Sequence, residues 1–295
     1  MTSPDGAVAV VLAGGASRRY GSDKLIADVA GAPLLERAVA GLAADRRVII
    51  VGPDRPVGRA VEFVPDDHPG GGPAAAMITG LRAALATPAE LITVLPGDAP
   101  GAGIAAEALL ARLDQDPAAT GVLAVDSDGQ EQPLQFALRR PAAERLIDAA
   151  GPDGGADASA RRLVLPLGLA RVALAGAETW DIDTPEQHRA WAWRDSPAVR
   201  MIEAAIAAEA PERLILLGTD PADVTALTRA VTLAPTGLLA DPTGPDHPAG
   251  WTARSLRPPA NGPARTPVLR VALRSPLDAA ADPAEIDLWV PRPDA

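Results

Sequence analysis

The chain has 295 residues, which is enough for one large α/β domain or for a domain with a smaller appendage. Its formal net charge of −11 gives no general attraction to nucleic acid or anionic membranes, because both bind through a basic field. There is no cysteine, and three scattered histidines do not favour a zinc cluster, so oxygen-ligated Mg²⁺ is the expected metal chemistry. The sequence has neither a signal-peptide pattern nor an apolar run near the ~18 residues that span a bilayer, which predicts a cytoplasmic protein.

In chain order, short β-branched apolar runs alternate with Ala/Leu/Glu-rich stretches of helical period. This alternation is typical of an α/β fold with a mostly parallel sheet covered by helices. We predict strands at residues 8–12, 48–51, 61–64, 91–95, 122–125, 134–138 and 171–175. Helices are expected at 33–44, 74–86, 102–114, 141–149 and 185–193. Thr184 before Pro185 is a helix-start signal, because Thr caps the helix and Pro suits its first position.

The pattern resets near residues 194–197. We therefore predict one domain over residues 1–195 and a small α/β appendage over 196–295. The appendage should contain helices at 198–210 and 222–231 and strands at 213–217 and 268–273. Its Pro/Gly-rich stretch, residues 235–267, is too interrupted for regular structure. We see no chemistry in the appendage, whose expected role is packing or association.

Lys24 is the only lysine among 27 basic residues. Bias toward arginine codons explains the scarcity, and chance could explain the position of a single lysine. However, an ammonium is a compact charge that fits between phosphate oxygens, whereas a guanidinium is a wide planar fork. Lys24 therefore indicates a site where arginine would not fit.

The strongest chemical signal is the segment LAGGASRRYGSDK, residues 12–24. A glycine pair at the end of a strand lets backbone N–H groups turn toward a triphosphate. Arg18, Arg19 and Lys24 could neutralise that triphosphate and the departing pyrophosphate. The segment is neither a Walker loop nor the dinucleotide fingerprint GxGxxG. The plainer alternative is an ordinary tight turn.

Carboxylates follow two further strands. Asp98 ends the apolar run 91–98, which places it at the carboxyl edge of the sheet, where it could hold Mg²⁺ against the α-phosphate. The alternative role for Asp98 is to cap the next helix. The loop 66–73 could bring a carboxylate to a base, and a carboxylate that accepts from guanine N1–H and its amine would select GTP over ATP. Asp181 and Asp183 alternate on an extended segment, so only one of them should face the site.

Residues 12–24 resemble the signature LAGGxSxRMGxDK of the molybdenum cofactor guanylyltransferase family, within the wider group of Rossmann-like nucleotidyltransferases. Four more segments resemble family motifs in the family's order: HPGGGPAAA (68–76) resembles PGxGPLAGI, PGDAP (96–100) resembles PCDxP, QPL (132–134) resembles (H/Q)PL, and DIDTPE (181–186) resembles NxNTPE(D/E). The resemblance covers roughly residues 7–193. It implies a Rossmann-like sheet with helices on both faces.

The resemblance also implies a reaction, in which the GMP part of GTP is transferred with Mg²⁺ to the phosphate of molybdopterin and pyrophosphate is released. The implied catalytic residues are Arg19, Lys24 and Asp98, and the implied metal ligands are Asp98 and Asp183. Asp66 is the implied carboxylate of the base loop, since its spacing to Gly72 fits better than that of Asp67. NTP contacts are expected from Leu12, Ala13, Gly14, Gly15, Ser17, Arg18, Lys24, Asp54, Asp66, Gly72 and Asp98. A molybdoenzyme or cofactor carrier is a further expected partner.

Some positions depart from the family pattern. Asp54 stands near a nucleotide-contacting Asn of the family, Tyr20 and Gly97 replace Met and Cys, and residues 74–77 replace the bulkier LAGI. The Asp-Ile-Asp ending resembles the related cytidylyltransferases, so the choice of base stays open. Asp183 could instead be a helix cap. The alternatives are a cytidylyltransferase, a sugar-phosphate nucleotidyltransferase of the same fold, or a non-catalytic nucleotide-binding protein.

Overall fold

A computed structural model describes residues 6–15, 20–29, 31–174, 176–194, 196–209, 214–218, 220–233, 239–241, 252–257, 269–274 and 288–291. The chain forms two compact units, Met1–Asp183 and Thr184–Ala295. This division falls before the sequence-based boundary at residue 195. Helix α7 (Pro185–Arg194) accounts for the difference, because it packs against α9 (Pro221–Leu233) of the second unit.

The first unit contains a seven-stranded sheet in the order β5-β4-β1-β6-β8-β7-β9. Its strands are β1 (Ala7–Leu12), β4 (Arg47–Val51), β5 (Glu62–Val64), β6 (Leu91–Pro96), β7 (Gly121–Val125), β8 (Glu131–Arg139) and β9 (Ala170–Ala173). Neighbouring strands run parallel except β8, which is antiparallel to both β6 and β7. The predicted mostly parallel sheet is confirmed.

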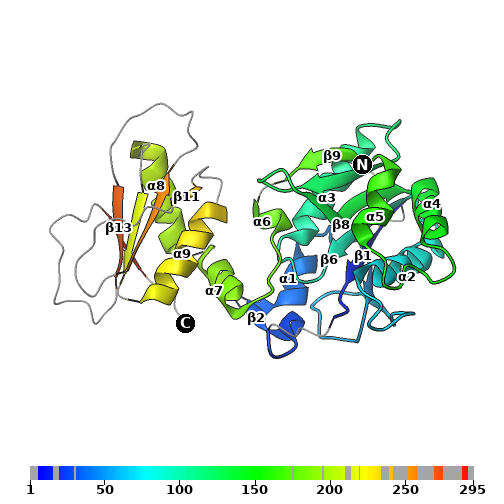
Figure 1. Cartoon of the computed structure of the whole chain (residues 1–295), viewed down its shortest axis with the longest axis horizontal. Coiled ribbons are helices and arrows are strands. Elements are labelled where there is room, and N and C mark those ends of the chain that lie inside the picture. The colour runs from blue at the N-terminus through cyan, green and yellow to red at the C-terminus, as the bar shows by residue number, and fades with distance from the viewer. Residues whose placement is uncertain are drawn as a thin grey trace. The chain divides into compact units, whose positions relative to one another are not determined.

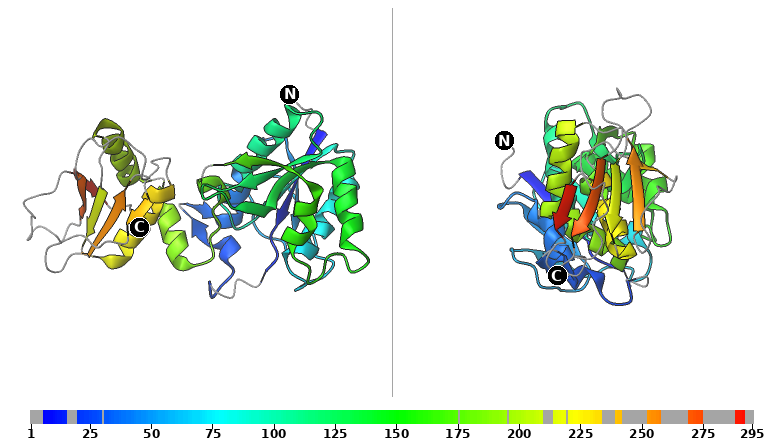
Figure 2. Two further views of the ribbon diagram at one scale, coloured as in Figure 1. Left: turned by 45° about the horizontal axis from the view of Figure 1, so that its top comes forward. Right: turned by 90° about the vertical axis from the view of Figure 1, so that its left-hand side faces the viewer.

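Helices cover both faces of this sheet (Figures 1 and 2). Helices α1 (Leu34–Ala40) and α3 (Ala102–Asp114) lie on one face; α2 (Pro73–Leu85), α4 (Arg140–Ala150) and α5 (Ala160–Val164) lie on the other. The remaining short elements are η2 (Lys24–Ile26), the hairpin β2 (Asp28–Val29) and β3 (Ala32–Pro33), η3 (Leu165–Leu167) and α6 (Gly176–Thr179).

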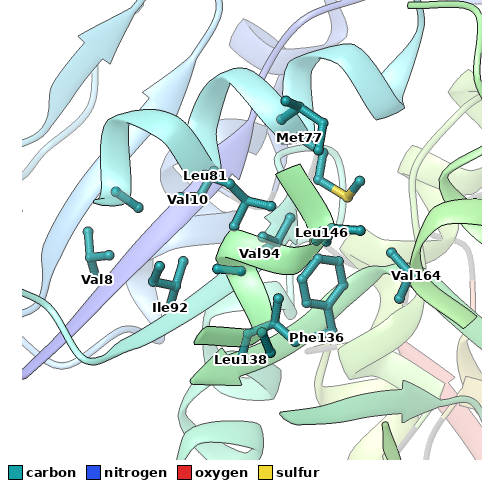
Figure 3. Close-up of a cluster of buried hydrophobic side chains, with 14 of the residues drawn as sticks. Val8, Val10, Met77, Leu81, Ile92, Val94, Phe136, Leu138, Leu146 and Val164 are labelled. Carbon is teal, nitrogen blue, oxygen red and sulfur yellow. The ribbon is translucent and has the colours of Figure 1, made fainter. Parts of the chain in front are cut away.

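The strands bury alternate residues on the two faces, as the period of a strand requires. Val10 and Val94 pack with Phe136 and with Met77 of α2 in the larger cluster (Figure 3). Leu91 instead belongs to the cluster beneath α3. Both faces of the sheet are therefore apolar and are covered by helices.

Two consecutive arginines at the end of β8 satisfy the carboxyl ends of helices on opposite faces. Arg139 donates to the carbonyls of Leu113 and Asp116, at the end of α3. Arg140 donates to the carbonyls of Leu85 and Thr87, at the end of α2. The last carbonyls of a helix lack intrahelical partners, so a cation there both pairs them and suits the helix dipole.

The second unit contains α7, α8 (Pro197–Glu209) and α9, with a five-stranded sheet in the order β11-β12-β10-β13-β14. Its strands are β10 (Leu214–Gly218), β11 (Leu239–Asp241), β12 (Thr252–Arg257), β13 (Leu269–Arg274) and β14 (Leu288–Pro291). The prediction of no regular structure over 235–267 was wrong, since β12 pairs antiparallel with β10. Residues 252–257 contain neither Pro nor Gly, so every N–H of that run can enter the sheet. Among the described residues, none of the helices is long and apolar enough to cross a membrane.

Candidate active site

The ends of β1 and β6 bring the glycine-rich segment next to Asp98. The two strands are parallel neighbours, with Leu12 opposite Pro96, and the N–H of Gly97 donates to the Leu12 carbonyl at 2.9 Å. A cavity of about 560 Å³ opens at this edge. It is lined by Leu12, Gly14, Gly15, Asp66, Gly70, Gly72, Pro73, Ala76, Pro96, Asp98 and Leu134. Residues from β1, β6, β8 and the start of α2 therefore share one site.

Lys24 joins two carboxylates beside this cavity. Its Nζ lies 2.8 Å from Oδ2 of Asp98 and 2.7 Å from Oδ1 of Asp183. The Lys24 side chain is only 12% exposed, whereas those of Asp98 and Asp183 are 28% and 36% exposed, so the ammonium is better shielded from solvent than the carboxylates. The structure thus brings together three residues that are far apart in sequence and that the family resemblance assigns to the reaction.

This arrangement shifts two pKa values. Burial alone would lower the pKa of Lys24, but the carboxylates of Asp98 and Asp183 outweigh it and raise that pKa above its ordinary value. Asp181 lies at the same edge. Partial burial of its carboxyl, followed by the charges of Asp98 and Asp183, raises the pKa of Asp181. Three carboxylates thus share one neighbourhood, where a cation is strongly favoured.

Backbone contacts hold the two aspartates of this site. The N–H of Ile182 donates to the carbonyl of Asp98 at 2.9 Å, which fixes the 181–183 segment against the end of β6. Helix α3 begins after Gly101, so Asp98 does not cap it. The capping role for α7 belongs to Thr184, whose hydroxyl accepts the N–H of Gln187, while the carboxylate of Asp183 contacts Lys24.

Of the two adjacent aspartates in the loop before α2, only Asp66 faces the cavity. Asp66 lines the cavity; its Oδ1 accepts the N–H of His68, and its Oδ2 lies 3.9 Å from the position that a Cβ on Gly14 would occupy. Asp67 instead pairs with Arg82 of α2. Gly72 precedes the first turn of α2 at the wall of the cavity, so the positive end of that helix dipole faces the site.

Not every residue expected to contact the nucleotide lies in the cavity wall. Ala13 is buried; its N–H donates to Val51, and its carbonyl accepts from Arg55. Asp54 is exposed on the loop after β4 and does not line the cavity. Ser17, Arg18 and Arg19 lie outside the described residues.

Two residues after β4 support the site without having been singled out in the sequence. A Cβ on Gly52, which has φ of +142°, would lie 2.7 Å from the carbonyl oxygen of Ala13, so only glycine lets the two strand ends approach this closely. Arg55 donates to that carbonyl and to Asp23. A basic residue in a polar loop gives no local sign of such contacts.

The described residues contain no group of three or more His, Asp or Glu side chains arranged to hold a metal ion. Asp98 and Asp183 nevertheless direct one carboxylate oxygen each at a common cation, the Lys24 ammonium. Mg²⁺ in nucleotide sites is usually held by one or two carboxylates together with substrate phosphates and water. This pair of oxygen donors fits that requirement.

The comparisons with known proteins agree with this geometry. Residues 9–167 match the model of the MobA-like NTP transferase domain. The chain belongs to this family. As a member it is a nucleotidyltransferase, and its matched region spans the glycine-rich segment, the Asp66 loop and Asp98 of the cavity.

Individual relatives of this NTP transferase domain carry consistent names. A "Probable molybdenum cofactor guanylyltransferase" of Chloroflexus aggregans is 34% identical over 191 residues, which is 60% of this chain and 83% of that protein. Another so named, from Deinococcus radiodurans, is 46% identical over 78 residues, covering 26% of this chain and 38% of that protein. The solved molybdopterin-guanine dinucleotide biosynthesis protein A of Archaeoglobus fulgidus is 20% identical, with a TM-score of 0.46 over 62% of this chain and 95% of its own.

Proposed function

We propose that this chain transfers the GMP part of GTP to the terminal phosphate of a molybdopterin-type acceptor. An oxygen of the acceptor phosphate forms a bond to the α-phosphorus of GTP, the bond from that phosphorus to the bridging oxygen of the β-phosphate breaks, and pyrophosphate leaves. An acceptor phosphate is already ionised at pH 7, so the reaction needs no general base. Catalysis then consists of positioning and charge neutralisation.

The observation that carries the proposal is the convergence on one cavity edge of a glycine pair, a shielded ammonium and two carboxylates. Gly14 and Gly15 line the cavity, where backbone N–H groups could cradle phosphates. The single ammonium of Lys24 is compact enough to reach phosphate oxygens and to stabilise the charge that builds up on the leaving pyrophosphate. Arg19 is proposed to assist it.

Asp98 and Asp183 are the residues proposed to hold Mg²⁺. When bound, the ion would supply charge neutralisation for the triphosphate. The task of the two carboxylates is to fix the cation at the end of β6, and the contact of Ile182 with Asp98 keeps the second aspartate in place.

Guanine is the proposed base. Guanine offers N1–H and an exocyclic amine as adjacent donors, and Asp66 brings a carboxylate with two acceptor oxygens to the cavity wall. The names of the relatives support the same base and acceptor. A cytidylyltransferase is the second candidate, because the Asp-Ile-Asp segment at residues 181–183 resembles that group.

The test is pyrophosphate release from each of the four nucleoside triphosphates, with Mg²⁺ and with molybdopterin or a sugar phosphate as acceptor. The product is identified by mass. We expect release only with molybdopterin, fastest with GTP, together with a molybdopterin–GMP product. Release with CTP alone would select the second candidate, and binding without release under all these conditions would refute the transfer reaction.

A further inference from the structure

Arg55 contacts both ends of the glycine-rich segment, residues 12–24. It follows β4, and its side chain is only 8% exposed. Its Nε donates to Oδ2 of Asp23 at 2.8 Å, and one terminal nitrogen donates to the carbonyl of Ala13 at 2.8 Å. A guanidinium has donors on separate edges of one rigid plane, so it can hold two acceptors at a fixed separation.

Ala13 and Asp23, two of the residues that Arg55 contacts, adjoin residues of the proposed site. Ala13 directly precedes Gly14, and Asp23 directly precedes Lys24. The other carboxylate oxygen of Asp23, Oδ1, accepts the N–H of Leu25 and caps the single turn η2, which begins at Lys24. One side chain therefore ties the end of β1 to the start of the turn that carries the ammonium.

Lys24 is the next residue in this series of contacts. Its Nζ meets Asp98 and Asp183 at 2.8 and 2.7 Å, which are distances of well-formed charge-assisted hydrogen bonds. Displacement of a catalytic group by about 1 Å can cost roughly 100-fold in rate. The position of Asp23 thus bears directly on the chemistry, although Asp23 itself does not line the cavity.

We infer that Arg55 is a positioning residue for Lys24, acting through Asp23; this inference rests on the proposed function. Arg55 holds Asp23 against the end of β1, Asp23 begins the turn at Lys24, and the turn directs the ammonium to the two carboxylates. A merely structural ion pair would affect the stability of the fold and leave the action of Lys24 unchanged.

The experiment is a double-mutant cycle between Arg55→Met and Lys24→Met in the full chain. Calorimetry measures the dissociation constant of Mg²⁺ with a GTP analogue that has a methylene group between its α- and β-phosphorus atoms. Arg55→Met is expected to weaken binding roughly tenfold when Lys24 is present, and by less than about twofold when Lys24 is already methionine. Equal weakening in both backgrounds, or none in either, would overturn the inference.

Two further variants keep the test decisive if Arg55→Met fails to fold. Asp23→Asn retains an oxygen to cap Leu25 but loses the charge that pairs with Arg55, and it should show the same dependence on Lys24. Arg47→Met is the matched control, because Arg47 lies on β4 and pairs with Glu62 at the exposed surface; we expect unchanged binding. Absence of pyrophosphate release by the wild-type protein would refute the proposed function separately, since the binding cycle does not need turnover.

Discussion

The ammonium of Lys24 lies 2.7 Å from Oδ1 of Asp183, a residue 159 positions further along the chain. Asp183 is the last residue of the first compact unit, and Lys24 follows its first strand. The ion pair therefore closes the site across nearly the whole length of that unit.

Asp98→Asn should abolish most of the turnover while the fold is retained. The substitution keeps the size of the side chain but removes the charge that faces Lys24, and loss of one pre-organised electrostatic contact costs about 100- to 1,000-fold in kcat. Pyrophosphate release and thermal unfolding are measured together. Asp67→Asn is the control, because Asp67 pairs with Arg82 outside the cavity wall; turnover equal to wild type in both variants would remove Asp98 from the mechanism.

The pKa of Lys24 should lie above that of an ordinary lysine. Since its folded-state pKa is raised, the protonated form stabilises the fold; this contribution is fully present below the pKa of the unfolded chain and is lost as the pH rises through the folded-state pKa. Lys24 is the sole lysine, so amine-reactive labelling followed by mass spectrometry reports on it and on the α-amino group alone. We expect slow labelling of Lys24 at pH 9 and faster labelling in Asp98→Asn. Faster labelling in the wild type than in that variant would contradict the raised pKa.

Asp66→Asn should reduce the preference for GTP. An amide has one acceptor oxygen where a carboxylate has two, so the variant cannot accept from both donors of guanine. We expect kcat/KM for GTP to fall about tenfold to 100-fold, in keeping with the loss of a charged hydrogen bond, with a smaller change for CTP. An unchanged GTP to CTP ratio would place the base away from Asp66.

Arg140→Met should lower the free energy of unfolding by about 1–3 kcal/mol, because three carbonyls near the end of α2 lose a charged donor. Arg145→Met is the control on the same helix; Arg145 is exposed, and its loss should change stability by less than about 0.5 kcal/mol. Denaturant unfolding of both variants gives the comparison. Equal stability of the two variants would show that the helix end does not depend on Arg140.

Gly52→Ala should destabilise the protein more than Gly129→Ala. Both glycines have positive φ, so both alanines carry backbone strain on the order of 1–3 kcal/mol. Only the Cβ at residue 52 would also meet the Ala13 carbonyl, whereas residue 129 has open space. We expect a larger fall in melting temperature and weaker GTP binding for Gly52→Ala alone. If the two substitutions had equal effects, the ends of β1 and β4 could move apart without loss of stability or of GTP binding.

The long elements of the first unit could be predicted because their apolar residues repeat with a clear period. Helix α3 has the predicted bounds, residues 102–114. Each strand of the β2–β3 hairpin has two residues, which are too few to show an alternation of apolar and polar residues in the sequence. In the second unit, pairing with β10 overrode the Pro/Gly-rich surroundings of β12.

Motifs point to Lys24, Asp98 and Asp183, which the structure brings together, but they do not show the contacts between them. Nothing local in the sequence shows that Arg55 reaches Ala13 and Asp23, which are 42 and 32 positions away. Spacing to Gly72 favours Asp66 over the adjacent Asp67, but only the structure shows that Asp66 lines the cavity and that Asp67 pairs with Arg82. The order of the motifs in the sequence indicates which residues belong to the site. The positions of the strand ends in the fold determine which of their side chains come into contact.

The most direct test of the account is the ¹⁵N–H signal of the Lys24 ammonium, which as the only lysine gives a single resonance of its kind. The protein is titrated with Mg²⁺ and the α,β-methylene analogue of GTP, and calorimetry supplies the dissociation constant independently. We predict that the resonance shifts with the same dissociation constant, because the ammonium exchanges contacts with Asp98 and Asp183 for contacts with phosphate. A resonance that stays unmoved while the nucleotide saturates the protein would contradict the account.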